Sequence, residues 1–258
     1  MAYYGSADIG FVILDGMDLV SNLTDFSDDA EAVIEETTVL GAPWMLNAAP
    51  GLNKYTFNAN GFYDDADNLS VEALVGSSGS SGGNIGSTRV LTYAPATNAL
   101  GKRFVGATIN EVKVARVPSR GALHKINASF VGNGRQEDGN IISPFGAKTG
   151  STGNSQATSY DGGSSSTRGG AGYYQQSTIT LDTSTNFVVS LRHSSDNITF
   201  ATLLTFTGST VSRQFGERMP TAASTTPVER YLAAAWAYSD TVANTTRTAT
   251  FFAGFVRG

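Results

Sequence analysis

The chain has 258 residues and a hydrophobic content of 40%, which is enough for one large or two ordinary domains with packed cores. It contains no cysteine, which excludes disulfides, thiolate metal sites and a cysteine nucleophile. The formal net charge is −5, no stretch approaches the roughly 18 apolar residues of a membrane span, and the first residues lack a secretory signal. We therefore expect a protein made in the cytoplasm that has no membrane span.

The charge is distributed unevenly along the chain. Residues 1–75 hold 13 acids and a single base, Lys54, whereas the remainder holds 9 acids and 16 bases. Such segregation predicts acid-to-base contacts between copies or a negative surface, and a solvated acidic face is the alternative.

The first 50 residues contain few clear strands. The apolar run Phe11–Leu14 ends in a turn signal, Asp15-Gly16. Asp28 and Glu31 have the spacing of a capping box for a short helix, and extended residues follow them. We interpret 23–40 as an arm or long loop.

The stretch 55–76 predicts a strand, a turn and a short helix. Apolar and polar residues alternate from Tyr55 to Asn60, which is typical of a half-buried strand. Gly61 ends this run, and acids then precede an apolar helical face at 71–75.

Further β segments follow between turns rich in Gly and Ser. We expect strands at 89–93, 104–117 with a bulge near Asn110-Glu111, and 124–130. Later strands are expected near 187–193, 203–206, 231–238 and 249–255.

The fold class predicted from this pattern is all-β. The predicted domains are 1–145, with an arm or loop in 1–50, a Gly/Ser-rich linker or loop at 146–172, and an antiparallel β-sandwich at 173–258.

No motif predicts catalysis or a cofactor. His193 precedes Ser194 and Asp196, but a triad needs groups that converge from separate elements, so we expect these residues to shape a turn. His124 is expected to be a half-buried strand residue. No phosphate-binding glycine loop is present.

The clustered acids do not form a calcium loop. Asp25–Glu36 lacks the glycine that such a loop needs, and Asp64–Asn68 is too short. A partial surface cation site is the alternative, and we predict no metal or cofactor.

Several stretches in order resemble the tail tube (major tail) proteins of long-tailed, non-contractile bacteriophages. The resemblance rests on DIGFVILDGMDL (8–19), VIEETTVLGAPW (33–44), the GFYDDA corner (61–66), the strands of 89–131, VSLRHSSDNITFATLLTF (189–206) and the ending 230–258. The last two look like the extra sandwich domain appended to many such proteins.

The resemblance implies a structural virion protein. Six copies would form a ring around a β-lined channel, and rings would stack into a tube through which DNA passes without specific binding. Its partners would be further copies of itself, the tape measure, tail terminator and distal tail proteins, and it would reside in the phage tail.

The resemblance also implies roles for particular residues. The strand–helix corner would be Gly61, Phe62, Tyr63, Asp64 and Asp65, and 71–75 would be a flanking helix. The charges facing the lumen or the next ring would come from a set of five acids: Asp28, Asp29, Glu31, Glu35 and Glu36.

Two rival functions remain open at this point. The C-terminal sandwich could bind carbohydrate or a host surface through Tyr231, Trp236 and Tyr238, although core packing is favoured for these rings. A polysaccharide hydrolase is the third hypothesis, and we predict that the protein is not an enzyme.

Overall fold

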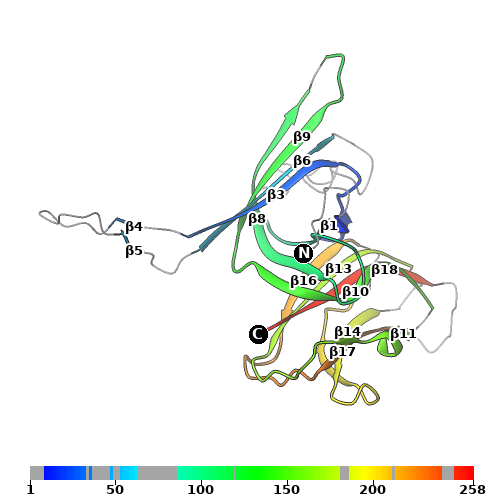
Figure 1. Ribbon diagram of the computed structural model, residues 1–258. Helices are drawn as coiled ribbons and strands as arrows, with labels where there is room; N and C mark the ends of the chain where they lie inside the picture. Colours follow the sequence, from blue (N-terminus) through cyan, green and yellow to red (C-terminus); the bar gives the residue numbers. More distant parts are fainter. Residues whose placement is uncertain are drawn as a thin grey trace, which may run out of the picture. The chain divides into compact units, whose positions relative to one another are not determined.

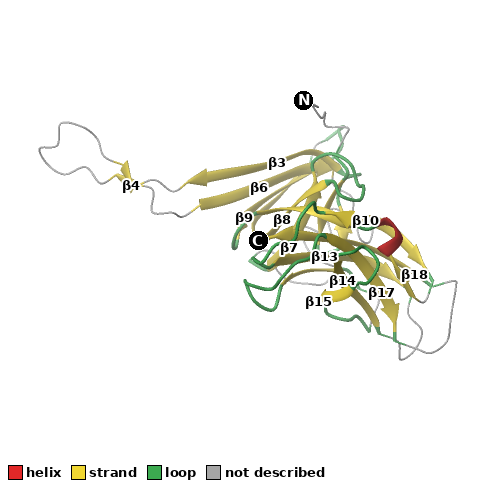
Figure 2. Cartoon of the chain, turned by 60° about the horizontal axis from the view of Figure 1, so that its bottom comes forward, coloured by secondary structure: helices red, strands yellow, loops and turns green. Residues whose placement is uncertain are grey.

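The computed structural model describes residues 9–32, 35–36, 47–48, 53–62, 86–118, 120–150, 152–180, 186–210, 213–239 and 247–258. Regular structure in these residues is almost entirely β-strand, with one short helical turn, η2 at Gln156–Thr158 (Figures 1 and 2). This confirms the predicted all-β class. Within the described ranges, no helix is long and apolar enough to cross a membrane.

The chain divides into two compact units. Unit 1 comprises residues 1–21, 89–108 and 137–258, and unit 2 comprises residues 22–88 and 109–136. These units differ from the predicted division into 1–145, 146–172 and 173–258. The segment predicted as a linker holds the end of β10 (Glu137–Thr149), β11 (Thr152–Asn154), β12 (Tyr160–Asp161) and the start of β13 (Gly170–Ile179). Glycine and serine can fill β-ladders, so composition misplaced this boundary.

Unit 1 contains two antiparallel sheets. The first has the strand order β16-β13-β18-β10-β8-β7-β1-β2, and the second has the order β11-β17-β14-β15 with β12 also paired to β17. The strands of unit 1 not yet given bounds are β1 (Phe11–Leu14), β2 (Met17–Asp18), β7 (Thr88–Ala94), β14 (Phe187–Ser194), β15 (Ala201–Thr205), β16 (Phe215–Pro220), β17 (Tyr231–Tyr238) and β18 (Thr248–Arg257). Strand β8 (Arg103–Val117) gives its first half to unit 1 and its second half to unit 2.

The main core of unit 1 lies between these two sheets. Alternate residues of β14, Phe187, Val189 and Leu191, are buried there as the sequence predicted. Phe251 and Phe255 of β18 enter the same core from the other sheet. Two antiparallel sheets therefore pack around one core in unit 1, and one of them includes β10, which the sequence placed mainly in the first domain.

Strand β18 is buried on both faces. It pairs with β13 along one edge and with β10 along the other. Phe252 points to a second cluster that also contains Phe11, Phe104 and Tyr173. Its ring centroid lies 4.9 Å from that of Phe11 and 5.2 Å from that of Phe104. Unit 1 is therefore organised around this strand.

A two-residue turn joins β1 to β2. Leu14 pairs with Met17, and the residues between them, Asp15 and Gly16, have φ values of 47° and 84°. Positive φ at both positions is characteristic of a type I′ hairpin, which explains the Asp-Gly sequence. The predicted turn is therefore confirmed.

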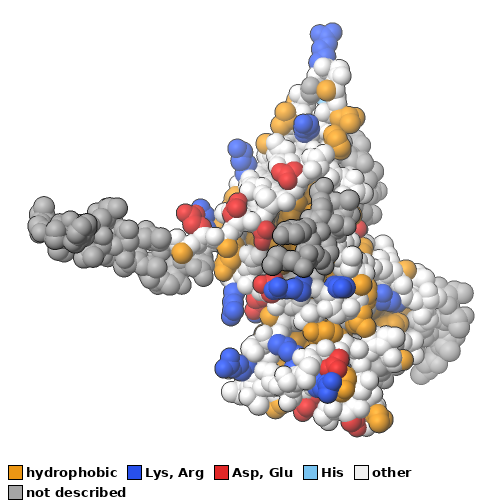
Figure 3. Space-filling model, in the orientation of Figure 1, with side chains coloured by type: hydrophobic (Ala, Val, Ile, Leu, Met, Phe, Trp, Pro, Cys, Tyr) orange, Lys and Arg blue, Asp and Glu red, His pale blue; other side chains and the backbone are white. Residues whose placement is uncertain are grey.

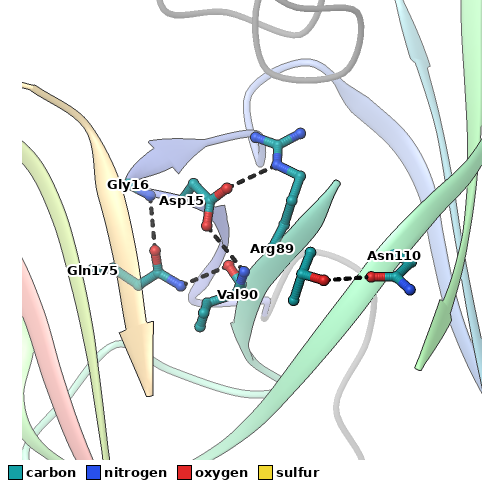
Figure 4. A network of polar contacts seen from close by, with 7 residues as sticks. Asp15, Gly16, Arg89, Val90, Asn110 and Gln175 are labelled. Carbon is teal, nitrogen blue, oxygen red and sulfur yellow. Dashed lines mark hydrogen bonds and ion pairs between the residues drawn. The ribbon is translucent and has the colours of Figure 1, made fainter. Parts of the chain in front are cut away.

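Polar contacts fix this turn against β7 and β13 (Figure 4). The Asp15 carboxylate accepts hydrogen bonds from Arg89 Nε at 2.8 Å and from the Val90 amide at 2.9 Å. The buried Gln175 amide accepts from the Gly16 N–H at 2.7 Å and donates to the Val90 carbonyl at 3.0 Å. Buried polar groups in this region are thus satisfied by one another.

Replacing Gly16 with alanine should strongly destabilise unit 1. A Cβ atom there would lie 1.8 Å from the Gln176 carbonyl oxygen, at a φ of +84°. Overpacking and a left-handed backbone together should cost about 3 kcal/mol of unfolding free energy. Gly86 is a matched control, because its φ is also +84° but no atom lies within 4 Å of its added Cβ. Thermal unfolding should show a much smaller change for Gly86→Ala, and equal changes would contradict the steric explanation.

Unit 2 contains a four-stranded antiparallel sheet. Its strand order is β3-β6-β9-β8, where β3 is Leu23–Ala32, β6 is Asn53–Phe62 and β9 is Lys125–Gly132. The short strands β4 (Glu35–Glu36) and β5 (Asn47–Ala48) pair with each other between β3 and β6 in the chain. The β4–β5 pair is therefore nested inside the β3–β6 pair in the chain.

Three sequence predictions concern unit 2. The capping-box helix at Asp28 and Glu31 is wrong, because both residues lie in strand β3. The bulge predicted near Asn110-Glu111 is confirmed by a register shift between Glu111 and Lys113. His124 was expected to be a half-buried strand residue, but it is exposed. It lies in the turn before β9, because the strand begins only at Lys125.

Candidate assembly surface

The sheet of unit 2 has one apolar face and one polar face. Strands β6 and β9 pair in register, so that Phe57 opposes Phe130 and Ala59 opposes Ala128. These four side chains are buried on one face of the sheet. The alternation expected for a half-buried strand at 55–60 is therefore confirmed.

The opposite face, here called the polar face, carries amides, hydroxyls and isolated charges. Its polar members are Asp25, Ser27, Asp29 and Glu31 of β3, Lys54, Thr56, Asn58 and Asn60 of β6, Lys125, Asn127 and Ser129 of β9, and Asn110 and Lys113 of β8. The register places four apolar residues on the same face: Phe62, Val131, Ala115 and Val117. Ser129 Oγ donates to Asn58 Oδ1 at 3.0 Å, and Asn60 Nδ2 donates to Asp25 Oδ2 at 3.3 Å. Three acids and three lysines leave this face neutral overall.

The two outer segments of this sheet are β3 and the last part of β8, Val112–Val117. Within the described part of the chain, β3 pairs only with β6. Strand β8 pairs with both β7 and β9, and the Glu111 carbonyl accepts from the Gly86 N–H at 2.8 Å, so the outer segment of β8 begins after Glu111. Outer strands present backbone N–H and C=O groups that can pair with another chain. Exposed acids at Asp28, Asp29 and Glu31 lie along β3. Edge charges of this kind restrict which strand can pair there.

The structure separates the acids that the sequence grouped together. Asp29 and Glu31 belong to the polar face, whereas Asp28 pairs in register with Phe57 and points to the other face. Asp28 Oδ2 accepts a hydrogen bond from Gln136 Nε2 at 2.9 Å. Glu35 and Glu36 form β4, and their side chains lie outside the described residues.

The strand–helix corner is described only in part. Gly61 and Phe62 end strand β6, and the Phe62 N–H donates to the Asn22 carbonyl at 2.9 Å. Tyr63, Asp64, Asp65 and the helix predicted at 71–75 lie outside the described residues.

The groups around His193 shape a turn. Ser194 Oγ donates to Asp196 Oδ1 at 2.7 Å, and His193 Nδ1 accepts from the Glu229 amide at 3.1 Å. Backbone donation by Thr199 and Ile198, with the Ser194 hydroxyl, lowers the pKa of Asp196 to about 2. Burial lowers the pKa of His193. Serine and aspartate thus hydrogen-bond to each other and to the turn backbone, as expected from the sequence.

The aromatic residues of β17 pack mainly into the core of unit 1. Tyr238 is 4% exposed, with its ring centroid 4.8 Å from that of Phe187. Trp236 borders a hollow of about 400 Å³, but its ring meets Phe251 edge-on at 5.8 Å. These rings therefore do not form a stacking platform with Tyr231, because Trp236 and Tyr238 pack against the core.

Among the described residues, no group of three or more His, Asp or Glu side chains could hold a metal ion. The feature that the sequence reasoning missed is the cationic turn between β8 and β9. Its signal was visible in the sequence, since 112–125 contains four Lys or Arg residues and no acid.

Comparisons with known proteins give no family assignment, because no family model and no curated protein matches the chain. Similar solved structures include a chain of the virion of the native gene transfer agent (GTA) particle, with 15% identity and a TM-score of 0.39, covering 52% of this chain and 97% of that one. A chain from the tail of the empty GTA particle has 12% identity and a TM-score of 0.37, with the same coverage. The SPP1 Dit protein, described as a paradigm of the hub adsorption apparatus in phages that infect Gram-positive bacteria, has 10% identity and a TM-score of 0.31, covering 94% of this chain and 97% of that one. These TM-scores are too low for the similarities to indicate a function.

Proposed function

We propose that this protein is a structural subunit of a bacteriophage-type tail, and specifically a tail tube protein that assembles into stacked rings of six copies. The observation that carries the proposal is the sheet of unit 2, which combines an apolar buried face, a neutral polar face and two outer strands. The resemblance of the DIGFVILDGMDL and GFYDDA stretches to tail tube proteins supports the same function.

In this proposal the outer strands join neighbouring copies of the chain. Strand β3 of one copy pairs with the outer segment Val112–Val117 of β8 in the next, so the sheet continues around a ring. Backbone hydrogen bonds supply the contact, and side chains on the two strands fix its register. A contact between two different surfaces closes into a ring when the rotation between copies permits.

The polar face then lines the channel. Non-specific affinity for DNA comes from Lys and Arg that neutralise phosphates. The central rows of this face are Thr56, Asn58 and Asn60 on β6 and Asn127 and Ser129 on β9, all uncharged. DNA in transit would meet uncharged hydroxyl and amide groups, which form hydrogen bonds as water does. It would therefore not be retained. This lining is neutral rather than negative, because the acids of β3 are balanced by lysines.

The proposed role requires no catalysis and no cofactor. The partners would be further copies of the chain and other tail proteins at the tube ends, namely the tape measure, tail terminator and distal tail proteins. The protein would reside in the virion and be made in the bacterial cytoplasm.

Negative-stain electron microscopy of the purified protein across a concentration series tests this function. We expect single rings at low concentration and hollow stacked tubes as concentration rises, because association follows mass action. Rings should show six-fold symmetry in class averages. Particles that remain monomeric throughout the series would contradict the proposal.

A further inference from the structure

The two ends of the unit 2 sheet carry opposite charge. At one end β8 turns into β9, and this cationic end is defined by Arg116, Arg120 and Lys125, all exposed. His124 lies beside them, and no acid occurs between Val112 and Lys125. In Figure 3, blue side chains lie around the end of the β8–β9 hairpin at the top of the view.

The acidic end lies at the other end of the same sheet. The register places Leu23 opposite Gly61 near the cationic end, and Ala32 opposite Asn53 far from it. The acidic end is therefore defined by the exposed acids of the later part of β3: Asp28, Asp29 and Glu31. Lys54 and Arg135 also belong to this end, so three acids lie beside two bases and the end is net negative.

The cationic end also has features of a contact surface. Val117 is 44% exposed and Leu123 is 70% exposed beside the charged side chains. A hollow of about 260 Å³ is lined by Arg116, Val117, Pro118, His124 and Lys125. Exposed apolar groups rimmed by charge are typical of protein contact sites rather than of solvated surface.

We propose that the cationic end of unit 2 docks onto the acidic end of unit 2 in a second copy of the chain, so that copies associate head to tail. The inference rests on the proposed tube function, because it names the contact that joins one ring to the next. Complementary ends on one sheet make the contact heterologous, and heterologous contacts that do not close produce filaments. Opposite charges orient the copies, and the apolar groups lose water when the ends meet.

The charge pattern also sets the polarity of stacking. Two cationic ends repel each other, as do two acidic ends, so only the head-to-tail arrangement is favourable. Exposed ion pairs are screened by salt, with a Debye length of about 3 Å at 1 M. Ring stacking should therefore weaken at high salt more than lateral pairing through backbone hydrogen bonds.

The test uses two variants of the 258-residue chain, and each variant has the charge of one end reversed. The acid-headed variant carries Arg116→Glu, Arg120→Glu and Lys125→Glu, and the base-tailed variant carries Asp28→Lys, Asp29→Lys and Glu31→Lys. The six positions are exposed, so circular dichroism and thermal unfolding should match those of the unaltered chain. Each variant alone, and then an equimolar mixture, is examined by sedimentation velocity and by electron microscopy.

The proposal predicts that each variant alone still forms single rings but does not stack them, whereas the mixture regains stacking. Single rings in each variant would show that lateral pairing of β3 with β8 is intact, because Asp28, Asp29 and Glu31 lie on β3 and Arg116 lies on β8. The acid-headed variant has two negative ends and the base-tailed variant has two positive ends, so only unlike copies can dock. The mixture should sediment as larger particles than either variant, and this gain should disappear in 1 M salt. A mixture no larger than its components would overturn the proposal.

The outcomes separate this inference from the proposed function. Tubes formed equally well by the unaltered chain and by both variants would support the tube function and overturn the docking of the charged ends. Association in the mixture without rings or tubes in any sample would support the docking and contradict the tube function. Duplex DNA that binds the unaltered chain but not the acid-headed variant, with stacking unchanged, would make the cationic end a nucleic-acid surface and overturn the proposal.

Discussion

A chain that ends at residue 247 is expected to be insoluble, or soluble only as a loosely packed state that lacks unit 1. The deletion removes β18, which lies between β13 and β10 and buries side chains on both faces. Phe251, Phe252 and Phe255 are each at most 1% exposed. Burial of each contributes about 1.5–3 kcal/mol, so three together approach the total stability of about 5–15 kcal/mol typical of a domain.

Removal of the exposed Gly258 alone is the control for this truncation, because it leaves every residue of β18 in place. Near-ultraviolet circular dichroism and dye binding should report native packing in the control and its loss in the truncated chain. The same reasoning predicts that residues 1–145 do not fold alone, since β10 would lose β18. Cooperative unfolding of the 1–247 chain would contradict the central position assigned to β18.

Sequence patterns predicted strands where one face of a sheet is buried and the other is not. Strand β6 alternates strictly, because Phe57 and Ala59 pack inward while Asn58 and Asn60 face outward. Strand β14 was predicted for the same reason. In such strands apolar and polar residues alternate with a period of two, which is visible in the sequence.

Strands without this asymmetry were missed or misread. In β13, Tyr173, Tyr174, Gln175 and Gln176 are consecutive and all buried, so the strand has no alternation and contains polar residues. Strand β3 has the opposite problem, because most of its later residues are exposed. The spacing of Asp28 and Glu31 resembled the start of a helix. The segment is a strand because it pairs with β6, and this pairing is not visible in the local sequence.

The candidate surface was predicted in part. The excess of acid in residues 1–75 was evident from the sequence, and it suggested contacts between copies. Which acids share a face depends on the register of β3 against β6, which places Asp29 and Asp28 on opposite faces. The position of the β8–β9 turn relative to these acids depends on the strand order, which no local pattern contains.

A cysteine placed on the polar face is expected to become shielded from large reagents when the protein assembles. The chain has no cysteine, so Lys113→Cys introduces a single thiol. Lys113 is exposed, pairs in register with Ser129 and lies outside both charged ends. In unassembled protein it should react with a small maleimide and with a polyethylene-glycol maleimide. In tubes, the polymer reagent should react at least about tenfold more slowly, because thiol reactivity requires access.

Ile198→Cys supplies the matched control for this experiment. Ile198 is 83% exposed in the turn after β14 of unit 1, so its thiol should react with both reagents before assembly. If the C-terminal sandwich projects outward, as the resemblance to tail tube proteins with an appended domain implies, both reagents should also label this thiol in tubes. The small reagent should still label Lys113→Cys there, since a channel that passes DNA admits small molecules. Equal labelling of Lys113→Cys by both reagents in intact tubes would place the polar face outside the channel, even if the protein forms tubes.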